Sequence, residues 1–523
     1  MEDLAKAPAM VDLWWIKRHS RLLIAVCVGL LGLGIYLWQL QVPELLSFYD
    51  SGVYLGASIH FVSGVMPYRD FTFVQPPGIL LLMSPIALLS LVFGSHDGFF
   101  LAGTVSALVT ALNAGLLAWL VRRSGVVAML VAGVGLVLLP EACLVDTGIN
   151  LEPYCLCLIL LGSIVILSTD VVVSRVSMRA VVIGGLLFGF AGSVKLWAVF
   201  PFVALVLSLA PRIRRQTGAL LSAAAVGFIV PSLPFFLAAP HRFISEVIVE
   251  QLFRGASTGA TASVAQRLIS MTGYSSTTIV PSATIVVIAF IGLACLVVLT
   301  HLRRGTRSAV ESFLALAAVI TLLGLLAPSV YYDYYGYFVA PFLLGSLGTA
   351  LARLAQPVHV RTMWISLSRV MRRFVTVFSA TSGVIFVIAM VLWITTFDSA
   401  YAFANGVYGP WLSSIDSYVP RGACVVYDEV AFGIFTNRFT SGGSRCPSIV
   451  DPQGALLATG SRATSALADS WLTYFQSAQY VVLTYPRTAN ILWDSGLSAW
   501  FTTHYHLAYG KAYIHIYQRS PPS

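Results

Sequence analysis

The stretch that follows the first apolar segment carries two carboxylates, an arginine and many aromatic residues. It reads Ser47-Phe-Tyr-Asp50-Ser-Gly-Val-Tyr54 and, further on, Gly64-Val-Met-Pro67-Tyr68-Arg69-Asp70-Phe-Thr-Phe-Val-Gln75-Pro-Pro-Gly78. A carboxylate such as that of Asp50 can accept the proton of a hydroxyl group, and a cationic group can hold a departing phosphate. Long loops in compact proteins are usually functional or disordered, and the aromatic and proline content argues against disorder. The stretch is therefore a candidate site.

Other charged residues lie at or inside apolar segments further along the chain. Asp146 and Glu152 stand between two such segments, where they could orient a substrate, hold a metal ion or merely mark the water interface. Lys195 lies inside a third apolar segment and would cost about 2.5–3.5 kcal/mol if it faced lipid. We therefore expect Lys195 to point into a polar cavity, where it could contact a phosphate.

Two further regions contribute candidates. Arg242 and Arg254 fall on a predicted outer loop at 240–278, whose Ser, Thr and Gly content after residue 255 predicts a mobile flap, and both are candidates for phosphate binding beside Arg69. Asp333 lies in an aromatic cluster that includes Tyr332. Such a cluster is typical of the interfacial belt of membrane proteins, and it could also form a stacking surface for a sugar or an isoprenoid.

The elements that must position these residues are membrane helices. The chain has 523 residues, of which 58% are hydrophobic and only 10% are charged, whereas soluble proteins carry about 25% charged and 45–50% apolar residues. This composition excludes a soluble, disordered or collagen-like chain, and the 7 Cys are too few for a disulfide scaffold. The net charge of +9 does not by itself indicate a nucleic-acid partner, because the position of the charges matters more than their sum.

A spanning helix needs about 20 mostly apolar residues. Eleven candidate spans fit this length or come close to it: 21–41, 99–121, 125–141, 150–169, 180–195, 196–211, 217–239, 279–301, 309–328, 336–354 and 374–396. The apolar segment 79–93 is short and follows two prolines, so we expect it to lie in or dip into the outer interface. We interpret 180–211 as a hairpin with Lys195 near its outer tip; one continuous crossing is the alternative.

The basic residues give these spans a direction. With eleven spans, nineteen Lys and Arg residues before position 397 fall on the side of the amino terminus and five fall on the other side: Arg69, Lys195, Arg242, Arg254 and Arg267. Short cytoplasmic loops are enriched in Lys and Arg. The pattern predicts a multi-pass protein of the cell membrane with a cytoplasmic amino terminus and an extracytoplasmic carboxyl terminus.

Residues 397–523 have the composition of a water-soluble domain. Alternating apolar residues predict strands at 423–427, 480–485 and 513–517, and the stretch 465–476 predicts a helix. We therefore divide the chain into a transmembrane domain at 1–396, with its first outer loop at 42–98, and an extracytoplasmic α/β domain at 397–523. Cys424 and Cys446 could form a disulfide there or stay as thiols.

The motifs of the first outer loop resemble those of GT-C glycosyltransferases, particularly relatives of the protein O-mannosyltransferases and the lipid A aminoarabinose transferases. The resemblance rests on Asp50, Tyr54, the Pro67–Phe71 segment, the Gln75–Gly78 segment and the acidic loop 146–153. It covers residues 20–200 well and the rest only through the topology and the outer carboxyl-terminal domain. Members of these glycosyltransferase families often have Lys where this chain has Gln75.

The resemblance implies a GT-C fold and transfer of a sugar from a polyprenyl phosphate to a glycan or glycolipid of the cell envelope. Asp50 would be the general base, with Asp146 and Glu152 as further catalytic residues. Arg69, Lys195, Arg242 and Arg254 would bind the donor phosphate, and the substrate cavity would be lined by Tyr54, Tyr68, Asp70, Gln75, Tyr332 and Asp333. The three acids could share a divalent metal ion or hold none.

Two other classes of function remain open at the level of sequence. A transporter or flippase of a lipid-linked or small polar substrate would show inverted repeats and ionisable residues near the middle of the bilayer. A scaffold that binds a partner through its outer domain would not need the acids of the first loop. Neither Gly-rich nucleotide-binding motif, GxxxxGK[ST] or GxGxxG, occurs in the expected context, and we expect no nucleic-acid partner.

Overall fold

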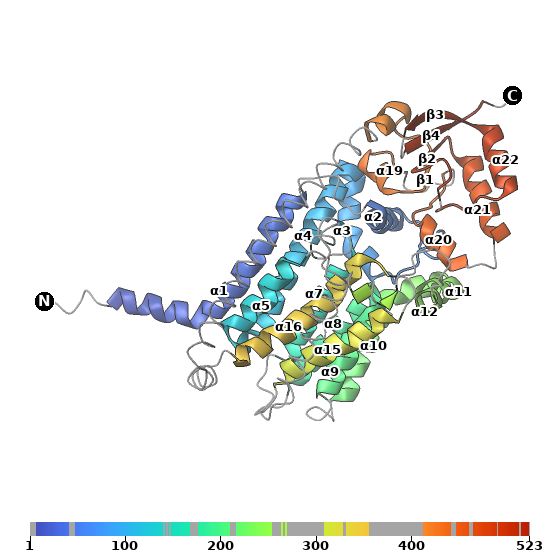
Figure 1. Cartoon of the computed structure of the whole chain (residues 1–523). Coiled ribbons are helices and arrows are strands. Elements are labelled where there is room, and N and C mark those ends of the chain that lie inside the picture. Colours follow the sequence, from blue (N-terminus) through green and yellow to red (C-terminus); the bar gives the residue numbers. More distant parts are fainter. Residues whose placement is uncertain are drawn as a thin grey trace.

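The computed structural model describes residues 7–40, 48–139, 142, 145, 148–167, 176–209, 216–253, 263–264, 267–268, 308–327, 331–354, 412–440, 446–459, 464–488, 490–511 and 514–521. A bundle of helices carries a small α/β domain at one end (Figure 1). The predicted spans 279–301 and 374–396 lie outside the described residues, as do Asp146 and Arg254.

The bundle is built from helices of unequal length, most of which are apolar. They are α1 (Ala7–Leu40), α2 (Phe48–Val62), α3 (Gly78–Phe93), α4 (Ser95–Leu120), α5 (Val126–Val137), α7 (Leu151–Leu167), α8 (Met178–Val194), α9 (Val199–Leu209), α10 (Thr217–Ala238), α11 (Pro240–Phe243), α12 (Glu250–Phe253), α15 (Ala309–Leu326) and α16 (Gly336–Leu354). Within the described part, His19–Leu40 of α1 and the whole of α4, α10 and α15 are long and apolar enough to cross a membrane, while α3, α5, α7, α8 and 196–209 are apolar but shorter. The predicted helical membrane architecture is confirmed, and the number of eleven spans stays a prediction.

Close helix packing in the bundle depends on small residues. A Cβ atom added to Gly189 of α8 would lie 2.0 Å from the carbonyl oxygen of Ala224 in α10, so only glycine allows the two helices to approach this closely. On the far side of the bundle from the α/β domain, Glu311 of α15 pairs with Arg353 of α16, and Ser308 caps α15 together with Glu311. The ion pair fixes α15 against α16.

The chain reverses its direction at Lys195. Helix α8 ends at Val194, Lys195 is extended, and a 3₁₀ turn (Leu196–Ala198) leads into α9. The rings of Phe188 and Phe202, which are equally far from Lys195 in sequence, lie 5.5 Å apart. A continuous helix would separate these two rings by about 21 Å. The predicted hairpin is therefore present, with Lys195 at its tip.

The carboxyl-terminal domain contains a four-stranded sheet in the order β1-β2-β4-β3. Its strands are β1 (Val425–Tyr427), β2 (Tyr480–Leu483), β3 (Tyr505–Lys511) and β4 (Ile514–Arg519), and its helices are α19 (Ala431–Phe435), α20 (Pro452–Thr459), α21 (Thr464–Ser477) and α22 (Ser495–His504). Strand β1 is parallel to β2, and the other two pairings are antiparallel. The three predicted strands and the predicted helix correspond to β1, β2, β4 and α21, whereas the sequence analysis missed β3.

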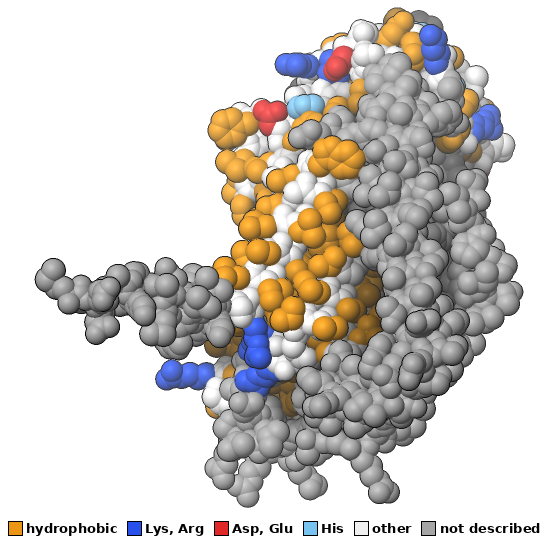
Figure 2. Space-filling view, turned by 60° about the vertical axis from the view of Figure 1, so that its left-hand side comes forward, with side chains coloured by type: hydrophobic (Ala, Val, Ile, Leu, Met, Phe, Trp, Pro, Cys, Tyr) orange, Lys and Arg blue, Asp and Glu red, His pale blue; other side chains and the backbone are white. Residues whose placement is uncertain are grey.

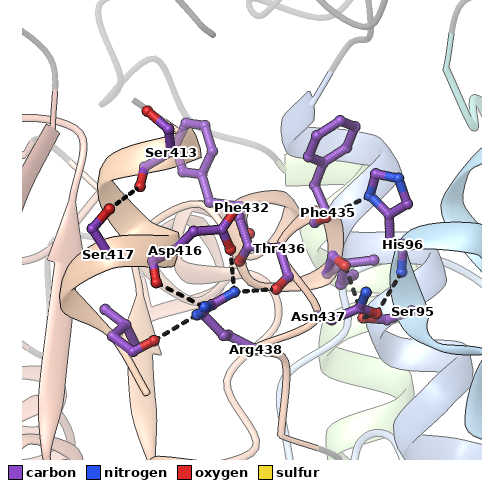
Figure 3. Close-up of polar contacts among 12 residues, drawn as sticks. Ser95, His96, Ser413, Asp416, Ser417, Phe432, Phe435, Thr436, Asn437 and Arg438 are labelled. Carbon is purple, nitrogen blue, oxygen red and sulfur yellow. Dashed lines mark hydrogen bonds and ion pairs between the residues drawn. The ribbon is translucent and has the colours of Figure 1, made fainter. Parts of the chain in front are cut away.

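Polar contacts dock this domain on the start of α4 (Figure 3). Ser95 donates a hydrogen bond to the carbonyl of Ile434 at 2.7 Å, and the ring of His96 bonds to the carbonyl of Phe435 at 2.7 Å. Asn437 accepts a hydrogen bond from the amide of His96 at 3.0 Å. The start of α4 is therefore anchored to the end of α19 and to Asn437, which follows it.

A second contact joins the domain to α2. A Cβ atom added to Gly52 would lie 2.4 Å from the amide nitrogen of Ala431, so α19 packs directly on the backbone of α2. Arg438 stabilises the docking loop from within the domain, because its guanidinium bonds to the carbonyls of Val419 and Thr436 and pairs with Asp416 (Figure 3). The domain is thus held against the helix that carries Asp50.

Candidate active site

A cavity of about 200 Å³ opens between α2, the hairpin tip, the turn before α16 and the carboxyl-terminal domain. Asp50, in the first turn of α2, lines it. So do Tyr49, Val53, Tyr54, Val74, Gln75, Lys195, Tyr332, Tyr334, Tyr335, Asp451, Gln453 and Gly454. The structure therefore brings together five of the residues predicted from sequence, namely Asp50, Tyr54, Gln75, Lys195 and Tyr332.

Asp50 is held by neutral groups. Its Oδ2 atom accepts a hydrogen bond from the phenol of Tyr334 at 2.9 Å, and no Lys or Arg in the described part of the chain forms an ion pair with it. Burial raises the pKa of Asp50 to about 6, the negative charges of Glu152 and Asp451 add to the rise, and the hydrogen bond from Tyr334 opposes it. A carboxylate with a raised pKa is a stronger base, and it is ionised at neutral pH.

Glu152 has the opposite environment. It lies in the first turn of α7, fully buried, and forms an ion pair with Lys195 from the hairpin tip. The Lys195 ammonium also lies over two aromatic rings, 3.7 Å from the centroid of Trp197 and 4.8 Å from that of Tyr335. Such buried pairs hold their geometry because either charge alone would be costly. Lys195 thus has a fixed position at the wall of the cavity.

The carboxyl-terminal domain contributes a second carboxylate to the cavity. Asp451 immediately precedes α20 and caps it, because its Oδ1 accepts a hydrogen bond from the amide of Gly454 at 2.8 Å. The phenol of Tyr49 donates to the same oxygen at 2.9 Å and accepts from the amide of Gln453 at 2.7 Å. Tyr49 therefore links α2 to the outer domain directly beside Asp50.

A neighbouring cavity of about 420 Å³ shares Asp451 with the first. Arg242 and Glu246 line it from one side, and Ser470 and Tyr474 of α21 line it from the other. Polar and aromatic side chains of this kind are suited to binding a polar ligand. The two cavities are therefore adjacent, and Asp451 lines both of them.

Arg242 and Glu246 also fix the first outer loop. They form an ion pair at 2.9 Å, Arg242 donates to Thr72 at 3.0 Å, and Glu246 accepts the amide of Phe73 at 2.9 Å. Gln251 donates to the carbonyl of Val74 at 2.5 Å. The described start of the predicted flap contains a π-helical turn (Ile244–Val249). This segment positions the part of the first outer loop that leads to Gln75.

The remaining predicted residues of the first loop have internal partners. Arg69 and Asp70 form an exposed ion pair at 2.8 Å, and the hydrogen bond from Arg69 lowers the pKa of Asp70. Tyr68 is fully buried, has a φ angle of 65° and donates to the carbonyl of Gln75 at 2.6 Å. The structure therefore places Arg69, Asp70 and Tyr68 in the loop framework and outside the residues that line the cavity.

Other predicted residues fall elsewhere. The side chain of Asp333 lies outside the described residues, although its backbone belongs to the 3₁₀ turn (Asp333–Tyr335) that also carries Tyr334. Cys424 and Cys446 form a disulfide in the outer domain, with Cα atoms 5.4 Å apart. Among the described residues, no group of three His, Cys, Asp or Glu side chains could hold a metal ion.

The sequence analysis missed Tyr49, Tyr334 and Asp451. Tyr334 stands in the aromatic cluster that drew attention to Tyr332 and Asp333, and Tyr49 directly precedes Asp50. The dipeptide Asp451-Pro452 is a recognisable start of a helix. Nothing in the sequence, however, shows that this start faces the first outer loop.

Comparison with known proteins agrees with this architecture. The sequence model of "Glycosyltransferase family 87", a GT-C family, matches residues 73–329. The structure of ArnT from Cupriavidus metallidurans bound to undecaprenyl phosphate is similar, with a TM-score of 0.59 and 15% identity over 95% of this chain and 98% of that one. The apo form of the same protein gives a TM-score of 0.56 and 16% identity over 96% and 98%.

A weaker similarity exists to the oligosaccharyltransferase AglB from Archaeoglobus fulgidus, with a TM-score of 0.48 and 12% identity over 90% of this chain and 70% of that one. No curated protein sequence matches the chain. The family match and the fold together define the class: the chain is a membrane glycosyltransferase of the GT-C superfamily. The predicted superfamily is thereby confirmed.

Proposed function

We propose that the protein transfers a sugar from a polyprenyl phosphate to a hydroxyl group of a cell-envelope glycan or glycolipid, with Asp50 as the general base. The acceptor oxygen attacks the anomeric carbon, the bond from that carbon to the phosphate oxygen breaks, and the polyprenyl phosphate leaves. Asp50 takes the proton of the attacking hydroxyl. The configuration at the anomeric carbon is inverted.

The observation that carries the proposal is the contrast between Asp50 and Glu152, the carboxylate that pairs with Lys195 at the cavity wall. Glu152 is paired with Lys195, whereas Asp50 lines the cavity, is bound by the neutral phenol of Tyr334 and has its pKa raised to about 6 by burial. A base needs an accessible lone pair and a pKa near the working pH. Asp50 meets both requirements.

Lys195 is our candidate for the donor phosphate. It lines the cavity and its ammonium is held by Glu152, Trp197 and Tyr335. A cation in a fixed position stabilises the charge that develops on a leaving phosphate without reorganisation. Gln75, which also lines the cavity, would add a hydrogen bond where related enzymes carry a cation.

The adjacent cavity of about 420 Å³ is our candidate for the acceptor. Asp451, Arg242 and side chains of α21 of the outer domain line it, and such a lining suits a polar acceptor such as a glycan headgroup. We further propose that this end of the bundle faces the extracytoplasmic side, as the distribution of Lys and Arg predicts. A lipid-linked donor fits that location because it crosses the membrane with its carrier.

A donor panel tests the proposal. Purified protein is incubated with radiolabelled polyprenyl phosphate sugars, including mannosyl, arabinofuranosyl and aminoarabinosyl donors, with a membrane extract as the source of acceptor. We expect consumption of one donor and label in the glycan or glycolipid fraction. Asp50→Asn is the inactive control. Consumption of no donor by the wild-type protein would contradict the proposal.

A further inference from the structure

A narrow groove of about 370 Å³ runs along the seam between α1 and α4, on the membrane-facing surface of the bundle. Small residues form its floor: a Cβ atom added to Gly115 would lie 3.0 Å from the carbonyl oxygen of Ala25, so the two helices approach closely there. Exposed apolar side chains such as Val26 and Leu112 form its rims. On the face that Figure 2 draws, hydrophobic side chains cover most of the height of the described surface of the bundle.

The groove has the length of one lipid leaflet. Its lining extends from Leu108 to Trp119 on α4 and from Leu22 to Leu33 on α1, which corresponds to about 17 Å along each helix. The hydrocarbon core of a bilayer is about 30 Å thick, so one leaflet contributes about 15 Å. A transmembrane helix of a partner would need a groove of twice this length, whereas an acyl chain fits it.

Three arginines stand at one end of the groove. Arg122 donates to the carbonyl of Trp119 at 2.8 Å, and its guanidinium lies 4.2 Å from the centroid of the Trp119 ring. Burial lowers the pKa of Arg122, and the nearby charges of Arg123 and Arg21 lower it further. Figure 2 shows blue side chains gathered at the lower end of the apolar surface. An anion placed there would relieve the repulsion between these cations.

We propose that this groove binds an anionic phospholipid, with the phosphate at Arg21, Arg122 and Arg123 and one acyl chain between α1 and α4. The proposal does not depend on the glycosyltransferase reaction, because the groove is a separate cavity that shares no residue with the two cavities around Asp451. Basic pockets between transmembrane helices at the headgroup level favour anionic lipids in this way. The bound lipid would fill the groove between α1 and α4.

Native mass spectrometry of the full-length protein tests this proposal. The detergent-solubilised protein receives equal amounts of phosphatidylglycerol and phosphatidylcholine with the same acyl chains. We expect the wild type to retain phosphatidylglycerol preferentially. The preference should fall by about fivefold for each arginine removed in Arg21→Gln and in Arg21→Gln/Arg122→Gln.

Two substitutions and their controls separate the headgroup from the tail. Leu112→Trp fills the groove and should reduce binding of both lipids, whereas Leu221→Trp, at an equally exposed position on α10, should not. Arg179→Gln, at an exposed arginine on α8, should leave the preference unchanged. Melting temperatures confirm that each variant is folded. Equal retention of both lipids by the wild type, an unchanged preference in the arginine variants, or dimers in place of lipid adducts would overturn the proposal.

Discussion

Asp50 and Glu152 are two carboxylates beside one cavity, and their partners make them different. Glu152 pairs with Lys195 and is fully buried, while Asp50 receives a hydrogen bond from the phenol of Tyr334 and faces the cavity. A carboxylate that pairs with a cation is a weaker base than one that is bonded only to a neutral donor. The residue type alone therefore does not identify the base.

The same contrast separates the basic residues. Lys195 is held at the cavity wall by Glu152 and two aromatic rings. Arg242, in contrast, forms hydrogen bonds with Glu246 and with Thr72 of the first outer loop. Both were candidates for the donor phosphate. Lys195 is positioned to contact a ligand in the cavity, and Arg242 is positioned to hold the first outer loop, which contributes to the cavity wall.

The largest effect is expected from Lys195→Met. It leaves the Glu152 carboxylate buried without its partner, which should lower the free energy of unfolding by about 3–5 kcal/mol. The double variant Lys195→Met/Glu152→Gln removes both charges and should recover most of this loss. Melting temperatures in detergent measure the effect on stability. If Lys195 also contacts the donor phosphate, the double variant stays inactive; full activity in the double variant would reduce Lys195 to a structural role.

Tyr334→Phe should change the pH dependence of the reaction. The hydrogen bond from Tyr334 lowers the pKa of Asp50, so its removal raises that pKa by about one unit. Because the base must be ionised, the rate rises with pH through the pKa, and the acid limb of the pH–rate profile should move to higher pH. An initial-rate series from pH 5 to pH 8 measures the shift. A limb that stays in place would show that Tyr334 does not act on the base.

Asp451→Asn should move the same limb in the opposite direction and by less. The negative charge of Asp451 raises the pKa of Asp50, and its effect is smaller than that of the Tyr334 hydrogen bond. The amide oxygen of Asn can still accept from Tyr49 and Gly454, so the cap of α20 is preserved. We expect a shift of less than about one pH unit to lower pH. A shift to higher pH would contradict the electrostatic picture of the cavity.

Much of the architecture could be predicted from the sequence. Apolar segments of the right length give the helices, and alternation of apolar residues gives β1, β2 and β4. Strand β3 (Tyr505–Lys511) was missed because its burial does not alternate and its side chains are largely exposed. Lys195 was expected to enter a polar cavity, and the close Phe188–Phe202 contact agrees with the predicted hairpin.

The site was only partly predictable because its residues come from distant segments. Asp50 stood out through its long aromatic loop, but its neighbour Asp451 lies four hundred residues away, in a different domain. Local patterns show that Asp451-Pro452 starts a helix; they do not show where that helix points. The docking contacts of Gly52 with Ala431 and of His96 with Phe435 decide this, and such contacts have no signature in one sequence.

The most direct test of the account is the rate of donor consumption by Asp50→Asn. Removal of a general base should lower the rate by about 10²–10⁴-fold. The melting temperature at pH 7.5 should be unchanged or higher, because burial has raised the pKa of Asp50 and the ionised carboxylate is disfavoured in the folded state. A folded Asp50→Asn protein that consumes donor at the wild-type rate would contradict the central claim that Asp50 is the base.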